Sequence, residues 1–128
     1  MKILVINPGS TSTKISLFED DTSLFEVSEF HDAPVLLKFP TVNDQVAFRK
    51  QVVLDILQRN GYTPEQVEVF VGRGGSAYPQ KAGVMPIDER LYRDTWNAIG
   101  GSEHAAKLGV LLAYELCNEF GGKMFTVN

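Results

Sequence analysis

Apolar residues fall into three short runs at the start of the chain, each with the length of a β-strand. The first, at 2–6, is continuous and rich in branched aliphatic residues, whereas the second, at 14–19, alternates apolar and polar positions. The third run spans 24–30 and follows the turn-forming residues 20–22. Because only short connections separate these runs, the pattern predicts three antiparallel strands in a meander.

The apolar spacing changes to the helical period near residue 43, and helices then alternate with strands. The predicted elements are, in order, a helix over 43–60 closed by Gly61, a capping-box turn at 63–66, a strand over 67–71, a helix from a cap at Ser102 to about residue 120, and a strand over 124–127. Three antiparallel strands followed by alternating helices and strands indicate an α/β domain in which helices pack on a mixed sheet.

Composition narrows the classes of protein that this domain can belong to. The chain has 128 residues, 44% hydrophobic residues and one cysteine, which favours a single globular domain in a reducing, cytoplasmic environment without disulfides. A formal net charge of −4 argues against nucleic acid as a partner, and the sequence has no apolar run long enough to cross a membrane. The last apolar run is cut off at Asn128, so we expect the chain to be a fragment of a longer protein.

The segment 7–13 joins the first two strands and is rich in potential ligand donors. It contains Asn7, a Pro-Gly pair and four consecutive hydroxyl residues. Two residues are enough to reverse a hairpin, so a seven-residue loop suggests a further role, in which the hydroxyls of Ser10 and Ser12 join backbone N–H groups around phosphate oxygens. The segment is not a Walker A loop, because it lacks the Gly-Lys pair and precedes a strand. A solvated turn remains the alternative.

Arg73 stands among glycines where the strand over 67–71 ends. Its guanidinium can bind a carboxylate or a phosphate through two hydrogen bonds, and Gly74 and Gly75 leave space beside it. The glycine spacing also matches a dinucleotide-binding fingerprint formally, but Pro79 lies where the helix of that motif would begin. The alternative is a surface arginine paired with an acidic neighbour.

His104 lies in the first turn of the last predicted helix. Helix N-termini attract anions, and a neutral histidine there can donate a hydrogen bond to a phosphoryl oxygen. A structural role is the alternative for His104, and it is the only interpretation that we give to His31.

Together these motifs resemble the N-terminal domain of the acetate and butyrate kinase family, with the butyrate kinases as the nearer branch. The residues that carry the resemblance are the NPGSTSTK sequence at 7–14, FRK at 48–50, VGRGG at 71–75, and EHA at 103–105 with Leu108 and Gly109. The resemblance covers the whole chain. It implies the ribonuclease H-like fold of the actin, sugar kinase and Hsp70 ATPases.

The resemblance also implies an activity, which is the reversible transfer of the ATP γ-phosphoryl group to butyrate or another short-chain carboxylate, with Mg²⁺. Residues 1–128 would form the N-terminal domain of a two-domain, homo-oligomeric kinase. The C-terminal nucleotide-binding domain would lie outside the chain, so the chain alone should be inactive.

Site residues follow from the same resemblance. Arg73 corresponds to the arginine that binds the carboxylate or acyl phosphate, and His104 to the histidine that hydrogen-bonds the transferring phosphoryl group. Asn7 lies near the metal and that group, whereas Ser10 and Ser12 face phosphate. Gly74 and Gly75 replace bulky apolar residues of acetate kinases, which suggests room for a longer acyl chain.

Asn128 departs from the family pattern, because it falls where the family has a catalytic aspartate. An amide cannot act as a carboxylate base. Either the alignment is off by a residue, or this member manages without the aspartate, or a later residue supplies one. A non-catalytic phosphate-binding module or a pseudo-kinase domain is therefore the alternative function.

Overall fold

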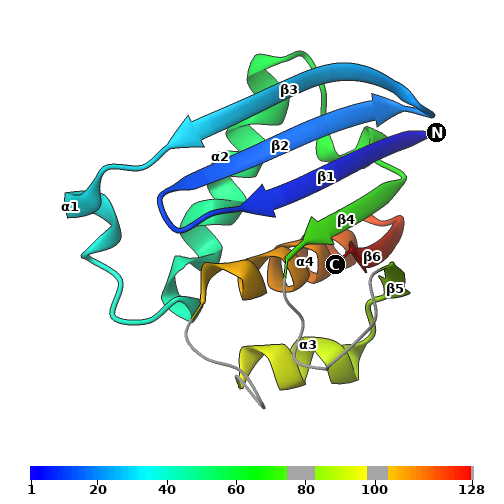
Figure 1. The fold of residues 1–128 in the computed structure, drawn as a ribbon. Coiled ribbons are helices and arrows are strands. Elements are labelled where there is room, and N and C mark those ends of the chain that lie inside the picture. The colour runs from blue at the N-terminus through cyan, green and yellow to red at the C-terminus, as the bar shows by residue number, and fades with distance from the viewer. Residues whose placement is uncertain (75–82, 98–103, 128) are drawn as a thin grey trace.

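A mixed sheet forms the centre of the computed structural model, which describes residues 1–74, 83–97 and 104–127 (Figure 1). Within these ranges the sheet has six strands in the order β3-β2-β1-β4-β6-β5. Their bounds are β1 Lys2–Pro8, β2 Ser12–Glu19, β3 Thr22–Phe30, β4 Val69–Arg73, β5 Val84–Pro86 and β6 Lys123–Val127. The first three strands are antiparallel, whereas β1, β4 and β6 run parallel. The predicted meander and the mixed sheet are confirmed.

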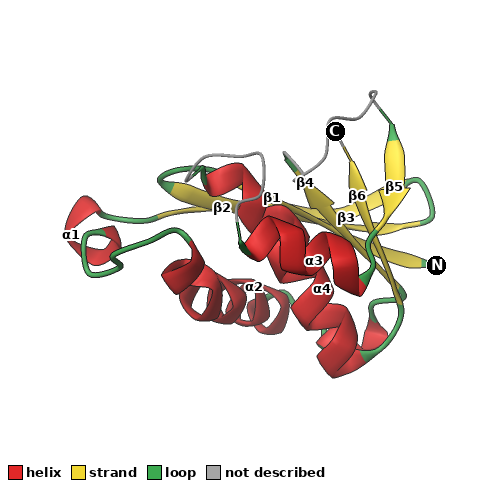
Figure 2. Ribbon diagram, turned by 90° about the horizontal axis from the view of Figure 1, so that it is seen from below, coloured by secondary structure: helices red, strands yellow, loops and turns green. Residues whose placement is uncertain are grey.

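The main helices lie on one face of the sheet (Figure 2). The helical elements are α1 Ala33–Leu36, a 3-10 turn Asn43–Gln45 that leads into α2 Val46–Arg59, a 3-10 turn Pro64–Gln66, α3 Glu89–Trp96, and a 3-10 turn Ala105–Lys107 that leads into α4 Leu108–Phe120. Among the described residues, no helix combines the length and apolar content needed to cross a bilayer.

The core lies between the sheet and the pair α2 and α4. The strands contribute side chains that are completely buried: Leu4, Ile6, Ile15, Leu17 and Phe70. The helices contribute Val53, Ile56, Leu57, Leu108, Leu111, Leu112 and Leu116, also with no exposed area. Each such side chain contributes roughly 1.5–3 kcal/mol by leaving water. The opposite face of the sheet, toward the viewer in Figure 1, carries no described helix.

Two glycines bring the end of β4 against the start of α4. A Cβ added to Gly72 would lie 2.0 Å from the carbonyl oxygen of Gly109, and one added to Gly109 would lie 2.3 Å from the carbonyl oxygen of Arg73. Real side chains do not tolerate such distances, so only glycine fits at both positions. This contact holds β4, which carries Arg73, against α4, which follows the turn that His104 caps.

Most element predictions are confirmed, and one is wrong. The capping box at Thr63 and Gln66 forms as predicted. The seven-residue loop over 7–13 does not form, because β1 continues to Pro8 and β2 begins at Ser12, so that Asn7 pairs with Lys14. Only residues 9–11 connect the strands, and the Gly9 N–H donates to the Ser12 carbonyl at 2.8 Å.

Three elements were not predicted, namely α1, β5 and α3. In α3, Tyr92 stacks on Tyr114 of α4 with ring centroids 4.1 Å apart and donates a hydrogen bond to Glu115 at 2.9 Å. This contact docks α3 on α4. The predicted cap Ser102 lies outside the described residues, and in the described part the last helical segment begins at Ala105.

Candidate functional site

Three parallel strands end at one edge of the sheet, and two of the predicted site residues lie there. Asn7 is next to last in β1, and Arg73 is the last residue of β4. Val127 of β6 pairs with Arg73. Ligands of open α/β sheets bind at the carboxyl ends of parallel strands, so this edge is where a site is expected.

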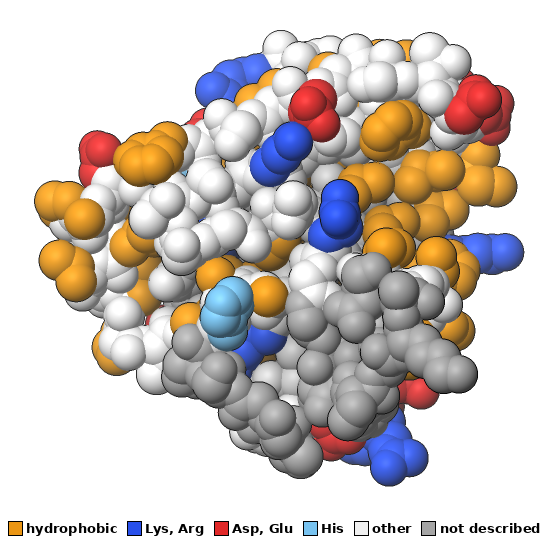
Figure 3. All heavy atoms as spheres, viewed as in Figure 1, with side chains coloured by type: hydrophobic (Ala, Val, Ile, Leu, Met, Phe, Trp, Pro, Cys, Tyr) orange, Lys and Arg blue, Asp and Glu red, His pale blue; other side chains and the backbone are white. Residues whose placement is uncertain are grey.

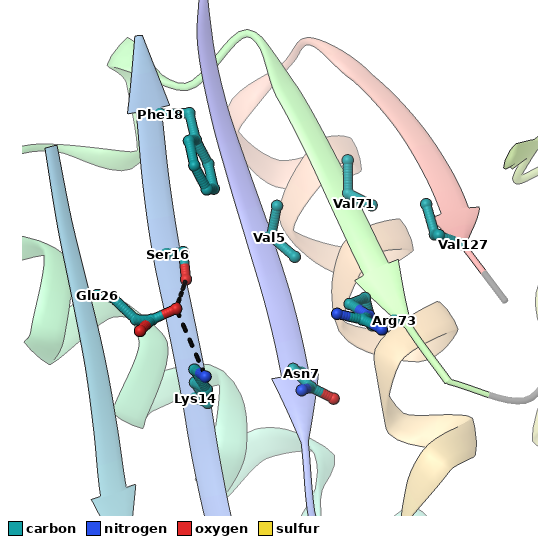
Figure 4. Close-up of a pocket in the computed structure, with 9 residues that line it drawn as sticks. All are labelled: Val5, Asn7, Lys14, Ser16, Phe18, Glu26, Val71, Arg73 and Val127. Carbon is teal, nitrogen blue, oxygen red and sulfur yellow. Dashed lines mark hydrogen bonds and ion pairs between the residues drawn. The ribbon is translucent and has the colours of Figure 1, made fainter. Parts of the chain in front are cut away.

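An open pocket of about 320 Å³ lies on the uncovered face at this edge (Figure 4). Its lining residues are Val5, Asn7, Lys14, Ser16, Phe18, Glu26, Val71, Arg73 and Val127. Asn7, Lys14 and Arg73 lie toward the strand ends, and the rest of the lining combines four apolar side chains, Val5, Phe18, Val71 and Val127, with Ser16 and Glu26. The structure thus places Asn7 and Arg73 in one pocket.

Arg73 is exposed, and its side chain has no hydrogen bond or ion pair with any residue in the described ranges. The alternative was a surface arginine paired with an acidic neighbour, but no acidic side chain among these residues pairs with Arg73. Its guanidinium points over the pocket beside Val71 and Val127 (Figure 4). A free cation beside an apolar floor can bind a small anion that carries a hydrocarbon tail.

Lys14 is a pocket residue to which the sequence argument gave no role. Its Nζ lies 3.4 Å from Glu26 Oε1, which also accepts a hydrogen bond from Ser16 Oγ at 3.2 Å. The Glu26 carboxylate therefore partly neutralises Lys14. The alternation of polar and apolar residues in β2 could have indicated this position, because it places Lys14 on the face of the sheet opposite to that of the buried Ile15.

His104 lies beyond this pocket, in the turn before α4. It is exposed and caps the 3-10 turn, and its Nδ1 accepts a hydrogen bond from the Ala106 N–H at 3.1 Å. When the ring is neutral, this bond leaves the proton on Nε2, which is then free to donate. Gly74 packs on the same turn, because a Cβ there would lie 2.5 Å from the Ala106 carbonyl oxygen.

Figure 3 shows the same face with side chains by type. Some basic side chains and a histidine lie near its middle, with an acidic side chain beside them, and other basic and acidic side chains lie along the outline. The central basic side chains favour an anionic ligand there despite the negative net charge of the chain.

The remaining predicted residues occupy different positions. Ser10 lies at the tip of the β1–β2 hairpin and Ser12 at the first position of β2, and neither lines the pocket. Gly74 has a positive φ of 128°, which favours glycine. Gly75 and Asn128 lie outside the described residues.

Two buried polar residues support the hairpin from inside. His31 is 4% exposed, its Nε2 lies 2.8 Å from Thr13 Oγ1, and burial lowers its pKa. This structural role agrees with the prediction for His31. Arg49 is completely buried on α2 and bonds to the hairpin. From the sequence Arg49 is noted only within the FRK motif and receives no role, although a charged residue three positions after Val46 and four before Val53 lies on the apolar arc of the helix.

Comparisons with known proteins support one family. The chain is 35% identical over 127 residues to Butyrate kinase 1 of Clostridium acetobutylicum, a match that covers 99% of this chain and 36% of that protein. The resemblance to the acetate and butyrate kinase family is confirmed. The chain spans about a third of the length of this curated relative. No family model matches the chain.

Solved structures of short-chain carboxylate kinases share the fold. Acetate kinase from Entamoeba histolytica superposes with a TM-score of 0.59 at 12% identity, over 99% of this chain and 36% of that one. A propionate kinase from Francisella tularensis gives a TM-score of 0.55 at 16% identity, over 98% of this chain and 36% of that one. The chain therefore shares the α/β fold of these structures, as the sequence predicts.

Proposed function

We propose that the full-length protein is a short-chain carboxylate kinase. It transfers the ATP γ-phosphoryl group reversibly to butyrate, or to a similar short or branched acid, and yields ADP and an acyl phosphate. The observation that carries the proposal is the pocket in which Asn7 and the free guanidinium of Arg73 meet an apolar floor. The similarity to a butyrate kinase supports the same reaction.

In this reaction Arg73 binds the carboxylate, and the alkyl chain lies against Val71 and Val127. Each buried CH₂ group contributes about 0.8 kcal/mol. Butyrate has two more CH₂ groups than acetate, so full burial favours it by about 1.6 kcal/mol, or roughly 15-fold in affinity. Gly74 adds no side chain next to Arg73, and the sequence has a second glycine at position 75, which supports the preference for a longer acid.

The transferring phosphoryl group is stabilised from the other side of the site. His104 donates from Nε2, and the tip of the hairpin, with Ser10 and Ser12, binds phosphoryl oxygens. Phosphoryl transfer asks the protein for positioning and charge stabilisation rather than for covalent chemistry. The donors at this edge of the sheet are suited to that task.

Magnesium in this proposal arrives with ATP. Within the described residues no three His, Cys, Asp or Glu side chains gather as a metal cage. Mg²⁺ is commonly held by substrate phosphates, waters and few protein ligands, and the Asn7 amide is suited to contact a metal-bound water. Mg²⁺ would supply charge neutralisation of the phosphates.

The nucleotide belongs to a second domain in this proposal. Residues 1–128 act as the N-terminal domain of a cytoplasmic, homo-oligomeric two-domain kinase, and they are inactive alone. The second domain would lie over the open face of the sheet, across the cleft between the two domains.

The test is ATP-dependent acyl phosphate formation by the full-length protein, trapped with hydroxylamine. Arg73→Ala should lower kcat/KM for butyrate at least 100-fold, and Arg73→Lys should recover part of it. Arg93→Ala is the matched control, because Arg93 is an exposed arginine on α3 that pairs with Glu89. Folded protein without product from any short-chain acid would refute the kinase and favour the pseudo-kinase or binding module.

A further inference from the structure

Every backbone carbonyl from Gly9 to Ser12 at the hairpin tip accepts a hydrogen bond. Arg49 Nη2 donates to the carbonyls of Gly9 at 2.8 Å and Ser10 at 3.3 Å, and Arg49 Nη1 donates to that of Ser12 at 2.5 Å. The carbonyl of Thr11 accepts from the His31 backbone N–H at 2.7 Å. The acceptors of the tip are therefore already used within the protein.

The hydrogen-bond donors of Ser10 and Thr11 at the tip, by contrast, have no partner among the described residues. Ser10 and Thr11 are exposed, and neither their N–H groups nor their hydroxyls bond to any residue in the described ranges. The hydroxyl of Ser12 likewise has no partner among those residues. A surface with free N–H donors and with carbonyls that already accept hydrogen bonds favours an anion over a metal ion or a cationic group.

Arg49 itself lacks a balancing charge. It is completely buried, and its printed partners are the tip carbonyls, the Thr13 hydroxyl at 3.0 Å and the Gln45 amide oxygen at 3.1 Å. No carboxylate pairs with it in the described part of the chain. Burial lowers its pKa to about 10, so it stays protonated at neutral pH. A buried cation without an opposite charge is costly, and an anion bound at the tip would supply that charge just beyond the carbonyls that Arg49 binds.

We propose that Arg49 is a positioning residue that fixes the hairpin tip with its donors toward the ligand, and that the phosphoryl group bound there balances its buried charge. This inference deepens the proposed function and rests on it for the identity of the ligand. The recognised chemistry is a phosphoryl oxyanion, carried either by the acyl phosphate or by ATP. Arg49 does not touch the ligand, because the carbonyls of the tip lie between.

The experiment compares the full-length wild-type protein with Arg49→Met, Arg49→Gln and Arg49→Lys. Met and Gln fill much of the same volume without the charge, whereas Lys keeps the charge but cannot make the forked set of bonds. Arg59→Met is the control, because Arg59 lies on the same helix, exposed, and pairs with Glu29 at 2.7 Å. Circular dichroism establishes that each variant folds.

Two readouts separate positioning from mere folding. Steady-state kinetics in both directions should show KM for butyryl phosphate or ATP raised about 10- to 100-fold in Arg49→Met, while KM for butyrate changes less than 3-fold. The substrate with the raised KM identifies which phosphoryl group the tip binds. The upward shift of Tm that inorganic phosphate produces in the wild type should shrink in Arg49→Met and be partly restored in Arg49→Lys.

Unchanged kinetic constants and an unchanged phosphate shift in a folded Arg49→Met or Arg49→Gln protein would overturn the proposal. So would a fall in Tm with the phosphate shift intact, because that is the signature of a structural role. If Arg49→Met does not fold, the Gln and Lys variants decide by the same criteria. Failure of the kinase proposal looks different: the wild type makes no acyl phosphate, yet its phosphate shift still depends on Arg49.

Discussion

Gly109→Ala should be destabilising although alanine is the better helix former. In an exposed helix the change from glycine to alanine gains about 1 kcal/mol. At Gly109 the new Cβ would lie 2.3 Å from the Arg73 carbonyl oxygen and 3.2 Å from its nitrogen. These are backbone atoms of a sheet strand, which cannot rotate away as a side chain can. Overpacking costs about 1–3 kcal/mol, and at a rigid backbone contact the upper end applies. The net loss is therefore about 1–2 kcal/mol.

The function should suffer as well, because α4 can relieve the contact only by pushing on Arg73, the residue that we propose binds the carboxylate. A displacement approaching 1 Å costs up to about 100-fold in rate. We expect Gly109→Ala to lower kcat/KM for butyrate by roughly 10-fold or more, mainly through a higher KM for butyrate.

The assay is a urea or thermal unfolding curve together with carboxylate kinetics on the full-length protein. Ala47→Gly is the matched control, because Ala47 is an exposed position on α2. The substitution there changes helix propensity alone, by about 1 kcal/mol. A Gly109→Ala protein that is more stable than wild type with an unchanged KM for butyrate would refute the close-contact reasoning.

Two further predictions concern the buried histidine and the pocket floor. Burial, and secondarily the charge of Arg49, lowers the pKa of His31 from 6.5 in the folded protein. Below about pH 6.5 the unfolded chain therefore binds a proton at His31 more readily than the folded protein does. The free energy of unfolding is highest above that pH and declines as the pH falls below it. Urea midpoints between pH 5 and 7.5 should show this decline, and His31→Gln should flatten it; an equal slope in the variant would contradict the assignment. Val71→Phe should fill the floor beside Arg73 and raise KM for butyrate roughly 10-fold with little effect on acetate, whereas an equal effect on both acids would place the alkyl chain elsewhere.

The sequence predicted those elements whose periodicity is strong. The meander, α2, α4 and β6 follow from apolar spacing over several turns or strand residues. By contrast, α3 buries only Leu91 and Thr95, which are too few positions to make a helical pattern visible. The loop of the β1–β2 hairpin was predicted too long, because Ser and Thr are typical of loops. Thr13, however, is completely buried and paired in β2.

Of the residues that line the pocket, Asn7 and Arg73 could be proposed from the sequence, but their arrangement could not. Asn7 and Arg73 each follow an apolar strand, and their chemistry could be read from the sequence. Their meeting depends on β4 pairing with β1 rather than with β3, an order that local patterns do not specify. The same limit applies to Arg49, because a sequence shows that a charge lies on an apolar helix face but not which backbone atoms satisfy it.

The most direct test of the account is a crystal structure of the full-length protein with a non-hydrolysable butyryl phosphate analogue. We expect the acyl end at the Arg73 guanidinium, the alkyl chain against Val71 and Val127, and phosphoryl oxygens on the N–H groups of Ser10 and Thr11. A ligand bound away from the Asn7 and Arg73 pocket, with the hairpin tip in contact with solvent alone, would contradict it.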